Sequence, residues 1–448
     1  MLNISKPLSA SQAQTYHEKE FTAAEQNYWK QGDTIQGEWH GKLADKFELS
    51  GAVGAEEFAR LSEGQHPQTG KQLVSHRTVH EYRNADGKMV SPVEHRAGWD
   101  ATFSAPKSVS LTALVGGDDR VREAHREAVN VALNELERYT QARIGGNHSA
   151  ETTGQFAAAK FEHDTARPVD GYAAPQLHTH VVVFNMTERD NGKMRALQPH
   201  SLFESQQFAT AVYQSHLTYK LRSLGYEIEA GKSGAPDIKG YTQEYLDASS
   251  PRRQQIEEAL SRSGFSGPEA AQIAAHNTRD KKVILSPDQI LAAHRQIADE
   301  FGNQADKVVA EARERRKEQA QERPDQERRQ QVREAVTFAR DKGFEREAVV
   351  DERALYPFGE CGFDLKADCG GGGHRSMFAL CSPITACRCQ PAFDPLLVQN
   401  PLTDCRQSLC FLYVSPFADL HLGHVWPLSP EIRQAAHRRR LRGNCRSG

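Results

Sequence analysis

The most regular hydrophobic pattern in the chain lies at residues 119–143. Apolar side chains recur there every three or four positions, which predicts a long amphipathic helix. Residues 10–31 are polar but compatible with a helix that ends before Gly32. Further helices are expected at residues 202–223 and 252–263.

Shorter segments have the pattern of strands. Residues 98–104 alternate between apolar and polar side chains, and Pro106 then marks the first turn of a helix. Two more strands are expected at residues 153–163 and 176–185, separated by a loop rich in proline, glycine and aspartate. Apolar residues on both faces of the second strand place it inside a sheet. We therefore expect residues 1–300 to form one α+β domain, an antiparallel sheet flanked by helices.

The character of the chain changes after residue 300. Between residues 301 and 355, acidic and basic side chains alternate at helical spacing in nearly equal numbers, which is typical of a solvated helix or a helical linker. A nucleic-acid tether is the alternative, and the near-zero net charge of this segment argues against it.

The last segment, residues 356–448, holds all eight cysteines and is rich in proline and arginine. Three interpretations stay open: a poorly ordered tail, a zinc module, or out-of-frame or foreign sequence. Against zinc, the CRC sequence at residues 387–389 lacks the paired spacing of zinc sites. The joint rise of arginine, proline, glycine and cysteine favours an aberrant sequence, which we expect to be poorly ordered.

Composition and charge limit the classes of function. With 448 residues and a net charge of −3, the chain is not a strongly basic DNA-coating protein, so any affinity for nucleic acid has to come from local patches. No apolar run approaches the ~18 residues of a membrane span, and the N-terminus lacks the apolar core of a signal peptide. We expect a cytoplasmic protein without a membrane partner.

The strongest chemical signal is PQLHTHVVVFN, at residues 175–185. Residues two apart in a strand share a face, so His178 and His180 point the same way. His163 ends the preceding strand, and if the two strands pair as a hairpin it returns beside the start of the second strand. Three imidazoles then converge at one end of the sheet.

Three neutral nitrogen ligands leave open coordination positions on a divalent ion, as a catalytic metal site requires. Imidazoles suit Zn, Mn or Ni, whereas phosphate chemistry and cellular abundance favour Mg or Mn. A set of hydrogen-bonded, half-buried histidines is the alternative. Asp100, on the strand at residues 98–104, is a candidate acceptor for the second N–H of a ligand histidine, although alone it would be read as a turn or cap residue.

Tyr16 and Tyr28 lie in the polar segment near the N-terminus and alone would be ordinary helix residues. Three motifs follow them in order: DATFSAPKSVS at residues 100–110, KFEH at 160–163 and PQLHTH at 175–180. In this order they resemble the MobF class of conjugative relaxases, within the HUH group of endonucleases. A weaker likeness, at residues 344–354, matches the family's entry into its helicase region, so that the resemblance covers roughly residues 1–355.

The resemblance implies a relaxase-like palm, with a helical segment near residues 200–300 that closes over single-stranded DNA. It implies site- and strand-specific nicking at a transfer origin, with a 5′-phosphotyrosyl link, a free 3′-hydroxyl and a reversible rejoining step. Accessory proteins of the relaxosome and a coupling protein are implied as partners. Two alternatives stay open: a rolling-circle replication initiator of the HUH group, and a truncated, non-catalytic protein that binds origin DNA.

The resemblance also implies roles for the candidate residues. Tyr16 makes the first cut and Tyr28 serves the second transfer. A metal polarises the scissile phosphate, and the residues implied to hold it are His163, His178 and His180. Asp100 accepts the tyrosine proton or orients a ligand histidine. Contacts to DNA phosphates are expected from Lys107, at a predicted helix start, and from Arg195.

Two departures from the family pattern stand out. Members of the family often carry tandem tyrosines, whereas the neighbours here are His17 and Trp29, so each position keeps one hydroxyl. The nucleotide-binding motif GxxxxGK[ST] does not occur in the chain, because Tyr226 stands where a glycine is needed before Gly231-Lys232-Ser233. No nucleotide cofactor is expected, and nicking is expected without ATP-driven unwinding.

Overall fold

The computed structural model describes most of the first 319 residues of the chain. The described residues are 1–18, 37–75, 82, 83, 87, 89, 90, 95–146, 148–231, 234–278, 285–319, 351 and 353. They fall within one unit, Met1–Gln390, whereas the second unit, Pro391–Gly448, lies outside the described residues. Tyr28 and the expected tail at residues 356–448 also lie outside them.

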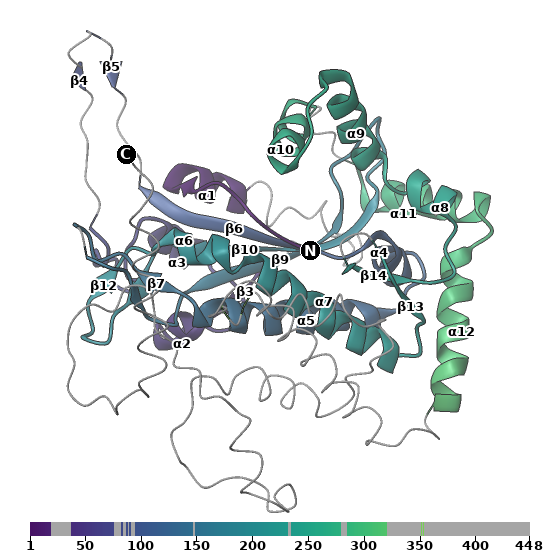
Figure 1. The fold of residues 1–448 in the computed structure, drawn as a ribbon, viewed down its shortest axis with the longest axis horizontal. Coiled ribbons are helices and arrows are strands. Elements are labelled where there is room, and N and C mark those ends of the chain that lie inside the picture. The colour runs from purple at the N-terminus through teal and green to yellow at the C-terminus, as the bar shows by residue number, and fades with distance from the viewer. Residues whose placement is uncertain are drawn as a thin grey trace, which may run out of the picture. The chain divides into compact units, whose positions relative to one another are not determined.

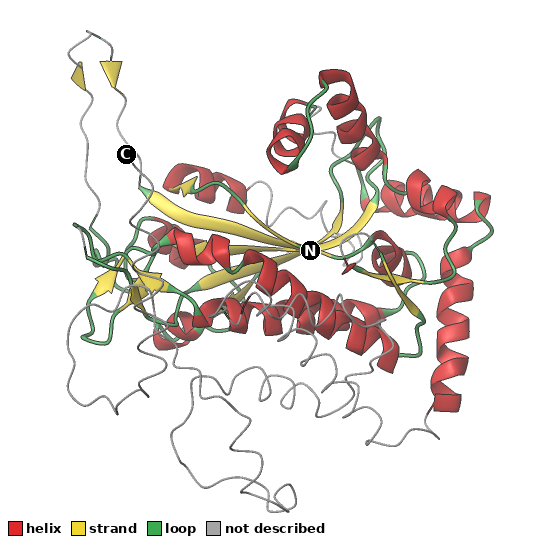
Figure 2. Ribbon diagram, in the orientation of Figure 1, coloured by secondary structure: helices red, strands yellow, loops and turns green. Residues whose placement is uncertain are grey.

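An antiparallel sheet flanked by helices forms the centre of the described part (Figures 1 and 2). Six of its strands pair antiparallel in the order β1-β6-β10-β9-β3, and β2 also pairs with β6. These strands are β1 (Leu2–Ile4), β2 (Leu8–Ser9), β3 (Glu38–His40), β6 (Arg96–Ser104), β9 (Ala158–Thr165) and β10 (Pro175–Phe184). The inner position of β10 explains its apolar residues on both faces, as the sequence predicts.

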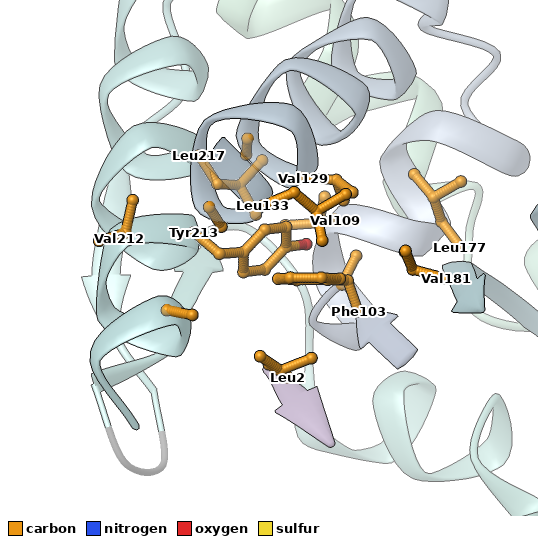
Figure 3. Close-up of a cluster of buried hydrophobic side chains, with 14 of the residues drawn as sticks. Leu2, Phe103, Val109, Val129, Leu133, Leu177, Val181, Val212, Tyr213 and Leu217 are labelled. Atoms are coloured by element: carbon orange, nitrogen blue, oxygen red, sulfur yellow. The ribbon is translucent and has the colours of Figure 1, made fainter. Parts of the chain in front are cut away.

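One face of the sheet packs against α4 (Lys107–Leu114), α5 (Asp119–Arg138) and α7 (Gln206–Ser223). The core between this face and the helices includes Leu2 and Phe103 from the strands and Val129, Leu133 and Tyr213 from the helices (Figure 3). The amphipathic pattern at residues 119–143 predicts this packing, although α5 ends at Arg138. The residues that follow form β7 (Gln141–Ala142), which pairs with β8 (Glu151–Thr152).

The other face is covered by three short helices. They are α1 (Ala10–Tyr16), α2 (Lys42–Lys46) and α3 (Ala55–Ser62). Their apolar side chains join Val182 and Phe184 of β10 in a second core cluster. Helix α1 begins at a capping box, in which the Ser9 side chain accepts from the backbone N–H of Gln12 and the Gln12 side chain accepts from that of Ser9.

The remaining described elements surround this layer. The helices are α6 (Pro199–Glu204), α8 (Gln243–Ala248), α9 (Pro251–Ser263), α10 (Pro268–Asn277), α11 (Pro287–Glu300) and α12 (Gln304–Gln319). The strand pairs are β4 (Tyr82–Arg83) with β5 (Met89–Val90), β11 (Thr187–Glu188) with β12 (Met194–Arg195), and β13 (Ile228–Ala230) with β14 (Pro236–Ile238). Helices α9 and α10 lie side by side as a pair (Figure 1). None of the helices in the described part of the chain is long and apolar enough to cross a membrane.

The expected α+β fold is confirmed, and the differences lie at element boundaries. The strand expected at residues 153–163 begins at Ala158, and the helix expected at 202–223 divides at Ser205 into α6 and α7. The helix expected at residues 10–31 is described as α1 up to Tyr16, and residues 19–36 lie outside the described part.

Candidate active site

Three histidines come together on the hairpin of β9 and β10. His163 of β9 is the register partner of His178 of β10, and His180 follows two residues later on the same face. The three ring centroids lie 5.0 to 5.2 Å apart. One nitrogen from each ring can be chosen so that all three lie within 4.8 Å of one another. The sequence predicts this convergence correctly.

Hydrogen bonds at Nδ1 orient two of these rings. His178 Nδ1 lies 2.8 Å from the backbone oxygen of Gln176, and His180 Nδ1 lies 2.7 Å from Oδ2 of Asp100. An oxygen acceptor at Nδ1 favours the tautomer that carries its proton there, which places the ring's lone pair on Nε2. His178 and His180 therefore have the form that a metal ligand requires.

The protonation state of His178 also suits a metal ligand. Burial, together with the neighbouring His180, lowers the pKa of His178 to about 3. A neutral imidazole donates its lone pair at ordinary pH. The donor set of three imidazoles thus fits a divalent ion with open coordination positions.

Asp100 lies on β6, the strand on the other side of β10. One carboxylate oxygen faces His180, and the other accepts a hydrogen bond of 3.2 Å from the Thr102 hydroxyl. Thr102 Oγ1 also lies 3.2 Å from His180 Nδ1. These contacts hold the carboxylate against the histidine ring.

Tyr16 is the last residue of α1 and is half-buried against the core cluster that contains Val182. Val182 follows His180 by two residues on the same face of β10, so α1 covers the sheet face that carries the histidines. Tyr16 and the histidine cluster therefore share one face of the sheet. Tyr28 lies outside the described residues.

His17 has a packing role that the sequence does not reveal. Its ring is buried and stacks on Phe58, with ring centroids 4.3 Å apart, and meets Phe161 edge-on at 5.6 Å. Burial lowers the pKa of His17, which favours the neutral ring. His17 thereby fixes the end of α1 next to Tyr16.

The two predicted DNA-contact residues have different surroundings. The Nζ of Lys107 donates to the backbone oxygen of Pro175 at 2.7 Å, at the start of β10, and burial lowers the pKa of this amine to about 7. Arg195, at the end of β12, is exposed.

The sequence analysis did not predict a group of polar residues on the sheet face opposite the histidines. Arg122, His125 and Arg126 of α5 contact β9 and β10 on the face opposite the histidines. The sequence does contain a pattern that could have indicated them. Arg122 and His125 interrupt the apolar side of a predicted amphipathic helix. Burial lowers the pKa of His125 to about 4.

Comparison with known proteins gives consistent matches. The family described as TrwC relaxase matches residues 10–301. The multifunctional conjugation protein TraI of Escherichia coli is 35% identical over 314 residues, and TraI of strain K12 is 33% identical. Each match covers 67% of this chain and 16% of TraI, so the chain spans about a sixth of that relative's length.

Solved structures of the conjugative relaxase TrwC also match. A copper-bound TrwC in complex with oriT DNA is 34% identical, with a TM-score of 0.56. A metal-bound TrwC complex with oriT DNA is 33% identical, with the same TM-score. Each match covers 67% of this chain and 99% of the TrwC chain. The histidine cluster, Asp100 and Tyr16 all lie within residues 10–301, the part that matches the family.

Proposed function

The chain belongs to the TrwC relaxase family, and on that premise we propose that it is a conjugative DNA relaxase. It cuts one strand of single-stranded transfer-origin DNA by transesterification and can rejoin the ends. The observation that carries this proposal is the three-histidine cluster on the face that α1 and Tyr16 cover. The DNA complexes of TrwC support the same substrate class for this chain.

Tyr16 is the proposed nucleophile of the first cut. Its phenol oxygen forms a bond to phosphorus while the bond from phosphorus to the 3′ oxygen breaks. The phenol loses its proton, and the departing 3′ oxygen gains one to become a free hydroxyl. The product is a 5′-phosphotyrosyl link, and because one phosphodiester replaces another, attack by a 3′-hydroxyl reverses the step. Tyr28 is the proposed nucleophile of the second transfer.

The proposed metal ligands are His163, His178 and His180. A divalent ion bound there supplies positive charge that polarises the scissile phosphate and offsets charge in the transition state. Mg or Mn is the proposed physiological ion, with Zn or Ni as alternatives by ligand type. The metal-bound and copper-bound TrwC structures support a divalent-metal site.

Asp100 is proposed to orient His180 rather than to accept the tyrosine proton. The distance of 2.7 Å to Nδ1 and the Thr102 hydrogen bond on the other oxygen engage both carboxylate oxygens. A carboxylate in this position fixes the ring and raises its basicity as a ligand.

The proposed DNA path crosses the histidine face. Arg195 and Lys107 are proposed phosphate contacts, and the helical segment within residues 200–300 is proposed to close over the strand.

Relaxosome accessory proteins and a coupling protein are the proposed protein partners, with action in the cytoplasm. Residues 1–300 are the proposed relaxase domain, followed by a charged helical linker at 301–355 and an aberrant tail at 356–448.

A nicking screen tests this function. The 448-residue protein is incubated with labelled oligonucleotides that tile both strands of the DNA flanking its gene, with Mn²⁺ or with EDTA. We expect one strand to be cut at one site, with Mn²⁺ only, leaving a 3′ end that a polymerase extends. We also expect no ATP-driven unwinding. Tight binding of an origin oligonucleotide without any cutting would instead support a non-catalytic origin-binding protein.

A further inference from the structure

Helix α5 presents a row of nitrogen-bearing side chains to the back of the sheet. Arg122, His125 and Arg126 are spaced so that they share one side of the helix. That side faces β9 and β10, the two strands that carry the histidine cluster. The cluster itself lies on the opposite face of the same strands.

Thr179 is the first contact of this row. It stands between His178 and His180 in sequence, so its side chain points to the opposite face of β10. Its Oγ1 lies 2.9 Å from Nε2 of His125, and Nδ1 of His125 lies 2.8 Å from the hydroxyl of Tyr213. Thr179, His125 and Tyr213 are all buried, so a hydrogen-bonded chain runs from α7 through α5 to the backbone that links two proposed ligands.

The two arginines make the second contact, on both sides of His163. Arg122 lies 3.0 Å from Glu162 Oε1 and 3.0 Å from Asp164 Oδ1. Arg126 Nε lies 2.7 Å from the second carboxylate oxygen of Glu162. Asp164 is 0% exposed and Arg122 is 4% exposed. The residues before and after the third proposed ligand are therefore tied to α5 by the buried ion pairs of Arg122 and by the partly exposed ion pair of Arg126.

These contacts are a costly way to stabilise a sheet. Burying charged and polar groups requires desolvation, and apolar side chains of similar volume often stabilise a protein as well or better. The polar contacts fix the position of the strands relative to α5, because a hydrogen bond forms only within a narrow range of distances and angles. A strand that slipped by one residue would turn its ligands to the other face.

We propose that α5 is a positioning helix for the metal site, with the Thr179–His125 hydrogen bond and the Arg122 and Arg126 ion pairs holding the three ligand histidines in their binding arrangement. This inference rests on the proposed function, in which the cluster binds a divalent ion. Arg122, His125, Arg126 and Thr179 lie on the face opposite the proposed ligands, and they act through His163, His178 and His180.

Thr179→Val tests the proposal directly. Valine keeps the shape of threonine and removes the hydroxyl, and Mn²⁺ affinity of the full chain is measured by titration calorimetry without DNA. We expect the affinity for Mn²⁺ to fall by about 10-fold or more, the range typical of lost outer-shell support. Thr179→Ser restores a hydroxyl and should restore most of the affinity.

The matched control is Thr112→Val. Thr112 is also buried, and its hydroxyl lies 2.7 Å from the hydroxyl of Tyr241, away from the histidines. Thermal unfolding of metal-free protein is recorded for both valine variants. A positioning role predicts that both lower the melting temperature and that Thr179→Val alone weakens Mn²⁺ binding. If Thr179→Val does not fold, Arg126→Gln, at a partly exposed residue, takes its place with an expected loss of about threefold.

The outcomes separate the two proposals. If the wild-type chain binds Mn²⁺ and Thr179→Val binds it with unchanged affinity, the positioning role of α5 is wrong and the proposed metal site stands. If the wild-type chain binds none of Mn²⁺, Mg²⁺, Zn²⁺ and Ni²⁺, the metal site of the proposed function is itself wrong, and the positioning role falls with it.

Discussion

At the scale of single residues, Asp100 carries the clearest testable role. Its carboxylate lies 2.7 Å from His180 Nδ1. Asp100→Asn removes the negative charge that favours the Nδ1–H tautomer, so we expect Mn²⁺ affinity to fall by roughly 10- to 100-fold. Calorimetry of the metal alone measures this change. Asp190→Asn, at an exposed residue, is the control and should bind Mn²⁺ as the wild type does; equal affinity of both variants would exclude the orienting role.

The salt dependence of DNA affinity tests whether Arg195 and Lys107 contact phosphates. Each lost phosphate contact reduces the slope of log affinity against log salt by about 0.7 for single-stranded DNA. We expect Arg195→Gln to reduce the slope by this amount without changing the melting temperature. Lys107→Met should lower the melting temperature, because the Pro175 carbonyl loses its donor. An unchanged slope in Lys107→Met would show that this lysine serves the fold alone.

At the scale of elements, the hairpin of β9 and β10 was predictable, whereas its exact register was not. Strand alternation and the turn-rich loop predict that His163, His178 and His180 share a face, and the structure confirms it. The pairing is irregular between Pro175 and His178, where the distant Lys107 donates to the Pro175 backbone oxygen, and no local pattern encodes this contact. Such an irregularity re-aims a side chain, here at the first histidine of β10.

Helix α5 shows a second limit of sequence reasoning. Its apolar spacing predicts a buried face correctly, but polar residues in such a pattern are normally assigned to solvent. Arg122 and His125 are buried instead, because acidic and hydroxyl partners on β9 and β10 compensate them. Those partners come from a distant part of the chain, so the sequence alone could not pair them. His17 was hidden for the same reason, since its partners Phe58 and Phe161 are remote in sequence.

Gly98 tests the pairing of β6 with β10. A Cβ at this position would lie 2.0 Å from the backbone oxygen of Val183, the neighbouring strand. We therefore expect Gly98→Ala to lower the free energy of unfolding by ~3 kcal/mol or more, the upper range for overpacking. Gly51→Ala is the control, because nothing lies within 4 Å there and only its φ of +71° opposes alanine. Chemical denaturation measures both, and equal losses would contradict a close approach at Gly98.

At the scale of the whole molecule, the described part contains the three histidines, Asp100 and Tyr16 on one face of one sheet. The expected relaxase-like α+β fold is confirmed by the TrwC structures that match it. The domain boundaries at residues 300 and 355 stay predictions, as do Tyr28 and the tail, which lie outside the described residues. The tail at residues 356–448 is marked by its composition alone, because it carries no periodic pattern from which packing could be argued.

Buried histidines predict how stability depends on pH. Burial lowers the pKa of His40, His125 and His294 to about 4 each, against about 6.5 in an unfolded chain. Between these values the unfolded chain binds protons that the folded chain does not, so stability falls as the pH drops from 6.5 to 4. Each such group adds ~1.4 kcal/mol per pH unit to the slope.

Urea unfolding of metal-free protein at pH 7.5, 6, 5 and 4 measures this slope. His294→Gln should reduce this slope by the contribution of one histidine, because glutamine does not titrate. Glutamine can still donate to the backbone oxygen of Ala173, which His294 contacts. His200→Gln, at an exposed residue, is the control variant. Stability that does not change between pH 6.5 and 4 would show that these rings are protonated in the folded state.

The most direct test of the central claim is the identity of the residue that captures DNA. Wild type, Tyr16→Phe and Tyr219→Phe are incubated with the oligonucleotide that the nicking screen identifies, with Mn²⁺ or EDTA, and resolved on a denaturing gel. The control Tyr219 lies on α7, on the other face of the sheet. We predict a Mn²⁺-dependent protein–DNA adduct in wild type and Tyr219→Phe, mapped by peptide mass to Tyr16, and its loss in Tyr16→Phe. An adduct of unchanged yield in Tyr16→Phe, or one mapped to another residue of the wild type, would contradict the account.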